Sequence, residues 1–298
     1  MTNRSGYVAI VGRPNVGKST LLNRLIGQKI AITTPKPQTT RHRILGINTI
    51  GADQIVYVDT PGIHLNAKKA LNRQLNRTAT GTIGEVDVIV LVVEALRWTE
   101  EDDLVVSKLA DISTPVILAV NKVDKIKDKE DLLPFLAKAG GKFPFAAVVP
   151  LSARRGDNIA PLEREILPRL PEGAAMFPED QVTDRSQRFI AAELVREKLM
   201  RVLEKELPYA LTVEIEKFDW DPKEERFEIA ALIWVERDSQ KAIVIGKGGA
   251  ALKEVGRQAR LDMQHVFDQR VYLQLWVKVK EGWSDDERAL KSLGYDDL

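Results

Sequence analysis

The stretch GRPNVGKS, residues 12–19, constrains the fold of this chain more than any other feature. It follows the apolar run Tyr7–Val11 and leads into TLLNRLIG, which has the spacing of a helix. A GxxxxGKS sequence between a strand and a helix is typical of a phosphate-binding loop, because its glycines let successive amides point at one anion. Lys18 would reach the β and γ oxygens, and the Ser19 hydroxyl would bind Mg²⁺. The chain is therefore predicted to bind a nucleoside di- or triphosphate.

Length and composition limit the class of protein further. At 298 residues the chain exceeds what one hydrophobic core usually organises, which favours two domains. A formal net charge of +1 does not by itself indicate a nucleic-acid or membrane partner, and the lack of cysteine excludes a disulfide framework and a thiolate metal site. The sequence has neither a signal-peptide core nor a bilayer-length apolar run, so we expect a cytoplasmic protein, with attachment to a membrane surface left open.

The first half alternates short apolar runs with amphipathic stretches. Strands are predicted at Tyr7–Val11, Arg43–Ile50, Ile55–Val58, Val86–Val93, Val116–Val120 and Ala146–Pro150. Helices are predicted at Ser19–Gly27, Ala67–Ile83, Glu100–Leu109, Lys129–Ala139 and Asn158–Leu170. This alternation predicts an α/β fold with a doubly wound, mostly parallel sheet, in which ligands bind beyond the carboxyl ends of the strands.

A DTPG sequence, residues 59–62, stands at the end of one of these predicted strands. A carboxylate from Asp59 is placed there to hold Mg²⁺, usually through water. Gly62 can offer a backbone amide to the γ-phosphate because no side chain stands in the way. We therefore predict that this motif completes the phosphate and metal site.

The sequence NKVD, residues 121–124, follows another predicted strand and indicates the base. The Asp124 carboxylate can accept from both N1–H and the exocyclic amine of guanine, whereas adenine offers neither donor in that arrangement, and such a site rejects the mismatched base by roughly 10⁴-fold. Asn121 would tie the loops together, and Lys122 would lie along the base plane. A later loop with Ser152 and Ala153 is placed to offer a backbone amide to the guanine carbonyl.

These motifs, in this order, resemble the translation-factor-like class of GTPases. The resemblance implies that residues 33–43 form the first switch, which becomes ordered around the γ-phosphate and Mg²⁺. Thr40 is the predicted Mg²⁺-binding switch threonine, and Thr39 is the alternative. The implied GTP-binding residues are Gly12, Arg13, Pro14, Asn15, Val16, Gly17, Lys18, Ser19, Thr20, Asp59, Thr60, Pro61, Gly62, Ile63, Asn121, Lys122, Val123, Asp124, Ser152 and Ala153.

No side chain is assigned as a catalytic base. Ile63 stands where Ras-like proteins carry the glutamine that orients the attacking water, so intrinsic hydrolysis should be slow, with Lys18, Thr40 and Gly62 acting by charge and positioning. Asn15 resembles an asparagine that helps to bind K⁺ in related bacterial GTPases, and we hypothesise that K⁺ supplies charge stabilisation here. The alternative is that Asn15 only braces the loop.

The second half changes character after residues 170–184, where proline, glycine and acidic residues indicate a linker. A helix is predicted from Ser186 to Leu207, followed by a hairpin of Ala210–Phe218 and Glu225–Glu236, two helices around a glycine turn, and a strand at Val271–Val279. This order resembles a type II KH module. The predicted domains are a GTPase domain (1–172), a linker (173–185), a KH domain (186–281) and a C-terminal tail (282–298).

The glycine turn itself predicts a nucleic-acid contact. Paired glycines between two helix ends let a single strand approach closely, and KH modules clamp about four nucleotides in this way. The predicted RNA-binding residues are Ile245, Gly246, Lys247, Gly248, Gly249, Lys253 and Arg257, with Lys241 and Arg260 extending a basic face. The alternative is a turn that only packs two helices. Trp276 and Trp283 are interpreted as packing anchors because their surroundings fit a half-buried strand.

The GRPNVGKS, QTTRHR, DTPG, NKVD, VIGKGG and SLGY sequences together resemble the Era family of bacterial GTPases over the whole chain. The resemblance implies a GTP-timed protein that binds the 3′ end of 16S rRNA and acts in 16S rRNA processing and 30S subunit assembly, with peripheral association with the inner membrane. A monomer is expected. One alternative is a membrane-associated signalling or cell-cycle GTPase whose KH-like part docks protein or lipid. Another is an ATP-driven RNA remodeller, which would require that Asp124 does not read the base.

Overall fold

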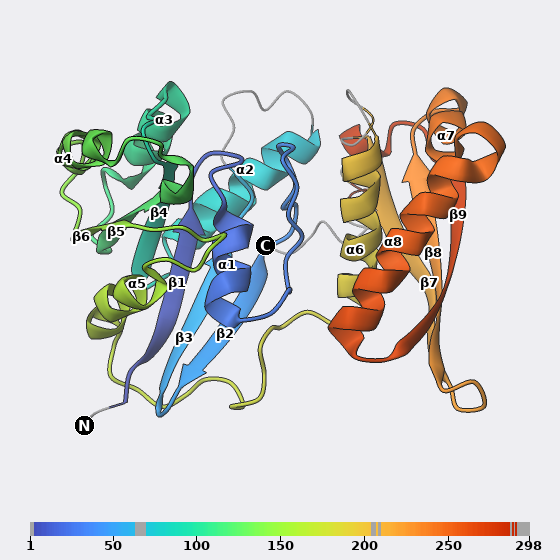
Figure 1. Ribbon diagram of the computed structural model, residues 1–298, viewed down its shortest axis with the longest axis horizontal. Coiled ribbons are helices and arrows are strands. Elements are labelled where there is room, and N and C mark those ends of the chain that lie inside the picture. Colours follow the sequence, from blue (N-terminus) through green and yellow to red (C-terminus); the bar gives the residue numbers. More distant parts are fainter. Residues whose placement is uncertain are drawn as a thin grey trace.

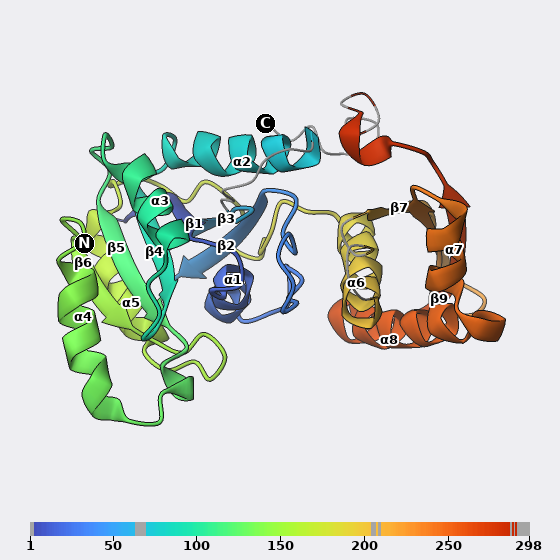
Figure 2. The ribbon, with the colours of Figure 1, turned by 90° about the horizontal axis from the view of Figure 1, so that it is seen from above.

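The computed structural model describes residues 3–62, 70–203, 207, 210–286, 288 and 290. It contains two domains, each built on its own sheet, and Figures 1 and 2 show them side by side with helix α6 (Gln187–Val202) on the side of the second domain that faces the first. No helix in the described ranges is long and apolar enough to cross a membrane.

The first domain has a six-stranded sheet in the order β2-β3-β1-β4-β5-β6. Its strands are β1 (Ser5–Val11), β2 (Ile44–Ile50), β3 (Asp53–Asp59), β4 (Val88–Glu94), β5 (Val116–Asn121) and β6 (Ala147–Pro150). Strand β2 is antiparallel to β3, and every other pairing is parallel. The predicted α/β, mostly parallel sheet is confirmed, and every strand end lies within two residues of its predicted position.

Helices cover both faces of this sheet. They are α1 (Lys18–Ile26), α2 (Ala70–Ile83), α3 (Glu100–Leu109), α4 (Leu132–Gly140) and α5 (Ile159–Ile166). Apolar residues of α1 and α5 pack on one face, and those of α2, α3 and α4 pack on the other. Strands buried on both faces need continuous apolar sequence, which explains why residues 88–93 of β4 are all Val, Ile or Leu and all buried.

Two predicted helices of this domain are shorter than expected. Residues 129–131 form a separate 3₁₀ turn before α4, and residues 167–169 form another after α5. Pro168 lies in the second turn, where its missing N–H cannot continue an α-helical ladder. Of the helix predicted at 67–83, residues 67–69 lie outside the described ranges.

The second domain has the element order α6, β7 (Leu211–Asp221), β8 (Arg226–Val235), α7 (Asp238–Ile245), α8 (Ala250–Phe267) and β9 (Arg270–Val279). Its three-stranded sheet has the order β7-β8-β9, with β7 antiparallel and β9 parallel to β8. Apolar residues of α6, α7 and α8 cover one face of the sheet. This is the order predicted for a type II KH module.

Three details of the second domain differ from the sequence prediction. Helix α6 ends at Val202 rather than near Leu207, because Leu203 is extended and its carbonyl accepts from Lys36 of the first domain. Strand β7 continues to Asp221, so the hairpin turn is shorter than predicted. Trp283 is fully buried as expected, whereas the interpretation of Trp276 as a packing anchor is wrong: it is 44% exposed on the face of β9 that turns away from the helices.

Candidate functional site

The phosphate loop joins the carboxyl end of β1 to the first turn of α1. Gly12 and Gly17 have φ values of 148° and 105°, in the range that favours glycine. A Cβ atom on Gly12 would lie 2.4 Å from the Val92 carbonyl oxygen, and one on Gly17 would lie 2.3 Å from Asn121 Nδ2. The two glycines are therefore required by positive φ and by the close approach of β4 and β5.

The Lys18 ammonium group lies inside the curl of this loop. Its Nζ atom donates to the carbonyl oxygens of Gly12 at 2.9 Å and Arg13 at 3.1 Å. Burial lowers the pKa of Lys18 to about 8, while the nearby Asp59 carboxylate acts in the opposite direction. An anion bound at the loop would offset part of the free energy that is lost by burying the Lys18 ammonium group. The buried cation is therefore suited to a phosphate ligand.

Three oxygen-bearing side chains meet next to Lys18. Asp59 Oδ2 accepts from Ser19 Oγ at 2.6 Å, and Thr40 Oγ1 lies 2.8 Å from Ser19 Oγ. Asp59 is fully buried, and within the described part of the chain its Oδ1 atom has no hydrogen-bond partner. Burial raises the pKa of Asp59 to about 6, although Lys18 and the two hydroxyls lower it. A buried carboxylate with an unpaired oxygen beside two hydroxyls is the kind of oxygen donor set that Mg²⁺ prefers.

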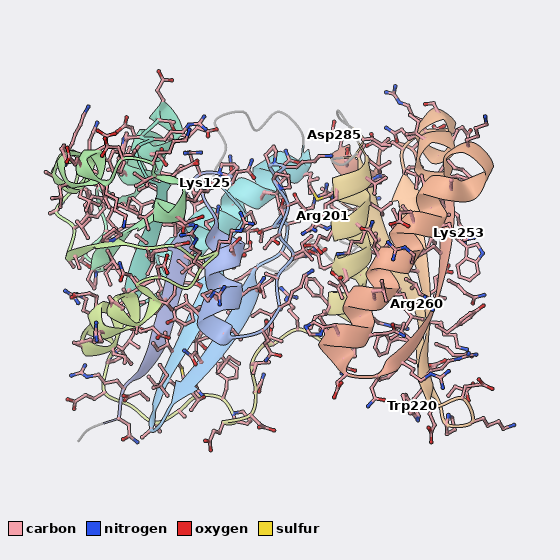
Figure 3. The ribbon with its side chains drawn as sticks, in the orientation of Figure 1. Lys125, Arg201, Trp220, Lys253, Arg260 and Asp285 are labelled. Carbon is pink, nitrogen blue, oxygen red and sulfur yellow. The ribbon has the colours of Figure 1, made fainter. Side chains whose placement is uncertain are left out.

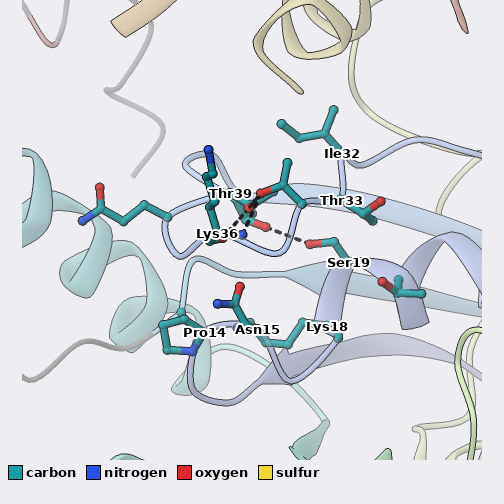
Figure 4. A pocket seen from close by; sticks show the side chains of 14 residues that line it. Pro14, Asn15, Lys18, Ser19, Ile32, Thr33, Lys36 and Thr39 are labelled. Carbon is teal, nitrogen blue, oxygen red and sulfur yellow. Dashed lines mark hydrogen bonds between the residues drawn. The ribbon is translucent and has the colours of Figure 1, made fainter. Parts of the chain in front are cut away.

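The side chain of Thr39, the alternative for the metal, points elsewhere. Its Oγ1 atom lies 2.6 Å from Thr34 Oγ1 and donates to the Lys36 carbonyl at 2.7 Å, which stabilises the switch loop itself. Figure 4 shows the pocket of about 60 Å³ between this loop and the phosphate loop, with Asn15 and Lys18 on one wall and Thr33 and Thr39 on the other. Ile63 lies outside the described residues.

Asn121 connects three loops at the predicted base site. Its Nδ2 atom donates to the Val16 carbonyl at 2.8 Å, and its Oδ1 atom accepts from the amides of Lys122 at 2.7 Å and Ala153 at 3.0 Å. Because the Ala153 amide already has this partner, its predicted contact with a guanine carbonyl would have to share the donor. Asn121 thus has the tying role expected of it.

The other two base-site side chains also lie together. Lys122 Nζ donates to the Asn15 carbonyl at 2.7 Å, which fixes its apolar stem beside the phosphate loop. Asp124 Oδ1 accepts from Ser152 Oγ at 2.7 Å. Ser152 thus orients the Asp124 carboxylate, and among the described residues no hydrogen bond occupies its second oxygen, which leaves that oxygen for a guanine donor.

Sequence reasoning missed two carboxylates that hold the phosphate loop. Arg13 is buried, and it pairs with Asp102 of α3 at 3.1 Å and with Glu94 at 3.3 Å. Glu94 also pairs with Lys122 at 3.1 Å, so one carboxylate joins the phosphate and base motifs. Both were detectable, since Glu94 ends a parallel strand and Asp102 stands three residues after Thr99 in a capping box.

The switch loop rests on helix α6 of the second domain. The Arg196 guanidinium, whose side chain is 2% exposed, donates to the Thr39 carbonyl and pairs with Glu193 at 2.6 Å. The Thr33 amide donates at 3.0 Å to the buried Glu197 carboxylate. The residue before the predicted metal-binding threonine is therefore bonded directly to the second domain.

A lysine that precedes the switch loop extends this interface to α8. Lys29 Nζ donates to Glu197 at 2.6 Å and to Asp262 of α8 at 2.9 Å, and Lys198 also pairs with Asp262. Helix α8 begins at the glycine turn. A continuous set of contacts thus runs from the switch loop through α6 to the helix predicted to bind RNA.

The glycine turn of the second domain presents its backbone to solvent. Gly246 has φ 74° and ψ 174°, and a Cβ atom there would lie 2.7 Å from Ala251 Cβ. Gly248 is also left-handed, and nothing lies within 4 Å of where its Cβ would be. Lys247 and Lys253 are exposed beside it. The turn therefore leaves room for a phosphodiester backbone next to two cations.

Arg257 is less available for binding RNA than the sequence suggested. It is exposed, but it forms two hydrogen bonds with Glu254, at 2.7 and 2.8 Å. These bonds, together with one from Gln258, lower the pKa of Glu254 to about 2, so the pair stays ionised and nearly neutral overall. Ile245, another predicted contact, is partly buried against the domain core.

Comparison with known proteins settles which family this architecture represents. A family model described as "50S ribosome-binding GTPase" matches residues 7–122, and a KH domain model matches residues 206–284. GTPase Era of Haemophilus influenzae (strain ATCC 51907) is 57% identical over 292 residues, which covers 98% of this chain and 96% of the relative. The chain belongs to the Era family of GTPases. GTPase Era of Pseudomonas aeruginosa (strain LESB58) is 58% identical over 296 residues, covering 99% and 96%.

Solved structures of the Era family agree with this assignment. A variant of Aquifex aeolicus Era bound to GDP and AlF4⁻ has a TM-score of 0.94 and 40% identity, covering 98% of this chain and 99% of that one. Era in complex with MgGDPNP and nucleotides 1506-1542 of 16S ribosomal RNA has the same TM-score and coverage, with 39% identity. The resemblance predicted from the motifs is thus confirmed, and so are the GTPase class and the C-terminal KH fold.

Proposed function

We propose that this protein binds and hydrolyses GTP and uses its KH domain to bind the 3′ region of 16S rRNA during rRNA processing and 30S subunit assembly. One observation carries this proposal: an exposed glycine turn flanked by lysines begins a helix that is bonded, through α6, to the switch loop of a GTPase domain. The relative solved with MgGDPNP and a 16S rRNA segment supports the same pairing of ligands.

The geometry of the first domain supports the following nucleotide and metal assignments. Residues 12–20 would hold the phosphates, residues 59–63 the γ-phosphate side, and residues 121–124 with 152 and 153 the guanine. Ser19, Thr40 and Asp59 would hold Mg²⁺, which neutralises charge on the β and γ phosphates. Lys18 brings a second cation to the same oxygens. K⁺ binding at Asn15 remains a prediction, supported by the exposed position of that residue at the pocket.

The two domains would be coupled through the switch loop. When Thr40 binds the metal, the adjacent Thr39 carbonyl is held in place, and this carbonyl is the acceptor for Arg196. When the γ-phosphate is lost, Thr40 would no longer be held at the metal site. The Thr39 carbonyl, which accepts from Arg196 of α6, would then move together with Thr40. GTP would thereby favour one position of the KH domain, and hydrolysis would release it.

Assembly of the small subunit takes place in the cytoplasm, so this function implies a cytoplasmic protein, and we propose that it acts as a monomer. The boundaries 1–172, 173–185, 186–281 and 282–298 are part of the proposal. Peripheral membrane association remains a prediction. The signalling alternative has no comparable support, because the relatives match over both domains.

The proposal is tested by comparing the RNA affinity of wild type with that of a single variant. Labelled single-stranded RNA from the 3′ end of 16S rRNA is titrated with protein at fixed salt, with a GTP analogue, GDP or no nucleotide, because phosphate contacts make affinity salt-dependent. Wild type should bind most tightly with the analogue. Gly248→Asp, which puts a carboxylate where the backbone of the strand passes, should lose this binding.

The matched control is Gly173→Asp. Nothing lies within 4 Å of its Cβ position and it stands in the linker, so the same change of charge should leave RNA affinity unchanged. RNA affinity that is absent in wild type, or equal in Gly248→Asp and wild type, would contradict the proposal and favour the signalling alternative.

A further inference from the structure

A second cavity lies at the far end of the KH domain from the glycine turn. Its volume is about 600 Å³, and it is shallow and open to solvent. One wall is the β7–β8 hairpin, with Trp220 and Glu225, and the other is the turn from α8 to β9, with Gln264, Asp268 and Arg270. None of these residues belongs to the glycine-turn clamp.

An exposed indole forms one wall of this cavity in a fixed position. Trp220 is 44% exposed, and its ring packs edge-on against Phe227, with centroids 5.2 Å apart and planes at 73°. Phe227 in turn packs against Phe267 of the domain core at 6.1 Å. A large aromatic ring that is anchored on one edge and open on a face is a platform on which a planar ligand can stack.

Hydrogen bonds fix the conformation of the two turns that form the cavity. Arg270 donates to the Glu224 carbonyl at 3.2 Å, which ties the hairpin to the start of β9. Asp221 Oδ1 accepts from the amide of Lys223 at 2.9 Å and shapes the hairpin turn. Glu225 and Asp268 are left-handed, with φ values of 47° and 50°. The cavity is thus part of the folded framework.

The polar groups of the cavity match a base better than a phosphate. Glu225 and Asp268 outnumber the single cation Arg270, so an anionic group gains little there. Carboxylates accept from exocyclic amines, and the carboxamide of Gln264 offers both a donor and an acceptor to a base edge. An aromatic platform beside such groups is the arrangement by which proteins hold unpaired RNA bases.

The position of the cavity places it in reach of an RNA strand held at the glycine turn. Helix α8 has 18 residues, about 27 Å, between the turn and the cavity. Four stacked nucleotides extend about 14 Å, so the clamp alone fills half of this path. In Figure 3, Lys253, Arg260 and Trp220 follow one another down the second domain from the glycine-turn end towards the hairpin.

We propose that this cavity is a second RNA subsite, which stacks an unpaired base carrying an exocyclic amine on Trp220 beyond the four nucleotides of the clamp. The proposal rests on the proposed RNA-binding function. A strand that occupies both places is held at the two ends of α8, and this gives the KH domain a preference for RNA longer than its clamp.

The test compares a short core RNA with the same core extended by four nucleotides at either end. Each extension carries either adenine bases or abasic sites, so the added phosphates are identical and only the bases differ. Full-length wild type should gain about 5- to 100-fold in affinity from the adenine extension at one end over the abasic one. Trp220→Ala should lose this gain and keep its affinity for the core, while Trp220→Phe should retain part of it.

Trp276→Ala is the matched control, because that indole is equally exposed on the opposite face of the sheet. It should keep the base-dependent gain. Equal binding of adenine and abasic extensions by wild type, or an unchanged gain in Trp220→Ala, overturns the subsite and leaves the clamp intact. Failure of wild type to bind the core would instead refute the proposed function together with the subsite.

Discussion

Replacing Asp59 by asparagine should stabilise the protein while abolishing its GTPase activity. Burial raises the pKa of this carboxyl group from 3.8 to about 6, so the ionised form is disfavoured in the folded chain. Each tenfold change in proton affinity corresponds to 1.36 kcal/mol, which gives a cost of about 3 kcal/mol at pH 7. Asparagine has nearly the same shape and removes that charge, and its Oδ1 atom can still accept from Ser19.

The pH dependence of this effect has a definite sign. Between pH 3.8 and about 6 the folded state holds the Asp59 proton more tightly than the unfolded chain, so the contribution of this group to stability falls as pH rises through that window. The stability gained by Asp59→Asn should therefore be near zero below pH 4 and reach its full value above pH 6. The difference between variant and wild type isolates this group from the others that titrate.

The measurement is urea dependence of amide hydrogen exchange in β1 and β3, in EDTA without nucleotide, which reports the first domain separately. In a second series with Mg²⁺ and a GTP analogue, the order should reverse, because only wild type gains from the metal. A variant that is less stable than wild type at pH 7 in EDTA, or a difference that does not change with pH, would refute this account of Asp59.

Two further substitutions test the base site and the domain interface. Asp124→Asn replaces an acceptor with an amide donor, so affinity for GTP should fall by roughly 10⁴-fold while a xanthine nucleotide gains; retained GTP preference in a competition assay would exclude the assigned base contact. Arg196→Met removes the buried cation that is hydrogen-bonded to Glu193, at a cost of up to about 3 to 5 kcal/mol in urea unfolding, since His42 and Arg41 still act on this buried carboxylate. Adding Glu193→Gln should recover much of that lost stability. Amide hydrogen exchange near Thr39 should increase in both the single and the double variant. An Arg196→Met protein as stable as wild type would show that the pair is not needed for stability.

The sequence was most informative where a local motif determines the backbone. Gly12 and Gly17 are needed by the conformation of the loop itself, so the motif predicts both the strand before it and the helix after it. The ends of β1, β3 and β5 meet because the sheet is parallel, and this places Lys18, Asp59 and Asn121 together.

Prediction was poorest where one domain covers the other. Residues 193 and 196–198 of α6 are charged, which in sequence indicates a solvent-exposed helix face. The structure buries all four, and each charge has a partner: Glu193 and Arg196 pair with each other, Glu197 pairs with Lys29 of the first domain, and Lys198 pairs with Asp262 of α8. Periodicity reports how polar a face is and not what covers it. The interpretation of Trp276 as a packing anchor was wrong for a related reason: alternation of apolar and polar residues distinguishes the two faces of a strand but does not indicate which face is buried.

The burial of Trp283 has a consequence for how the two domains move. Trp283 lies at the start of the C-terminal tail, where Ser284 donates to Glu236 of the KH domain, and it packs with Leu71 and Leu75 of α2. Through this tail the second domain is held to the first there as well as at α6. A body fixed at two separate points cannot turn about one of them while the other stays in place. Both contacts must be released in the same step, which disfavours partly rotated arrangements. RNA affinity should accordingly change between two discrete values as nucleotide is exchanged, without a graded series between them.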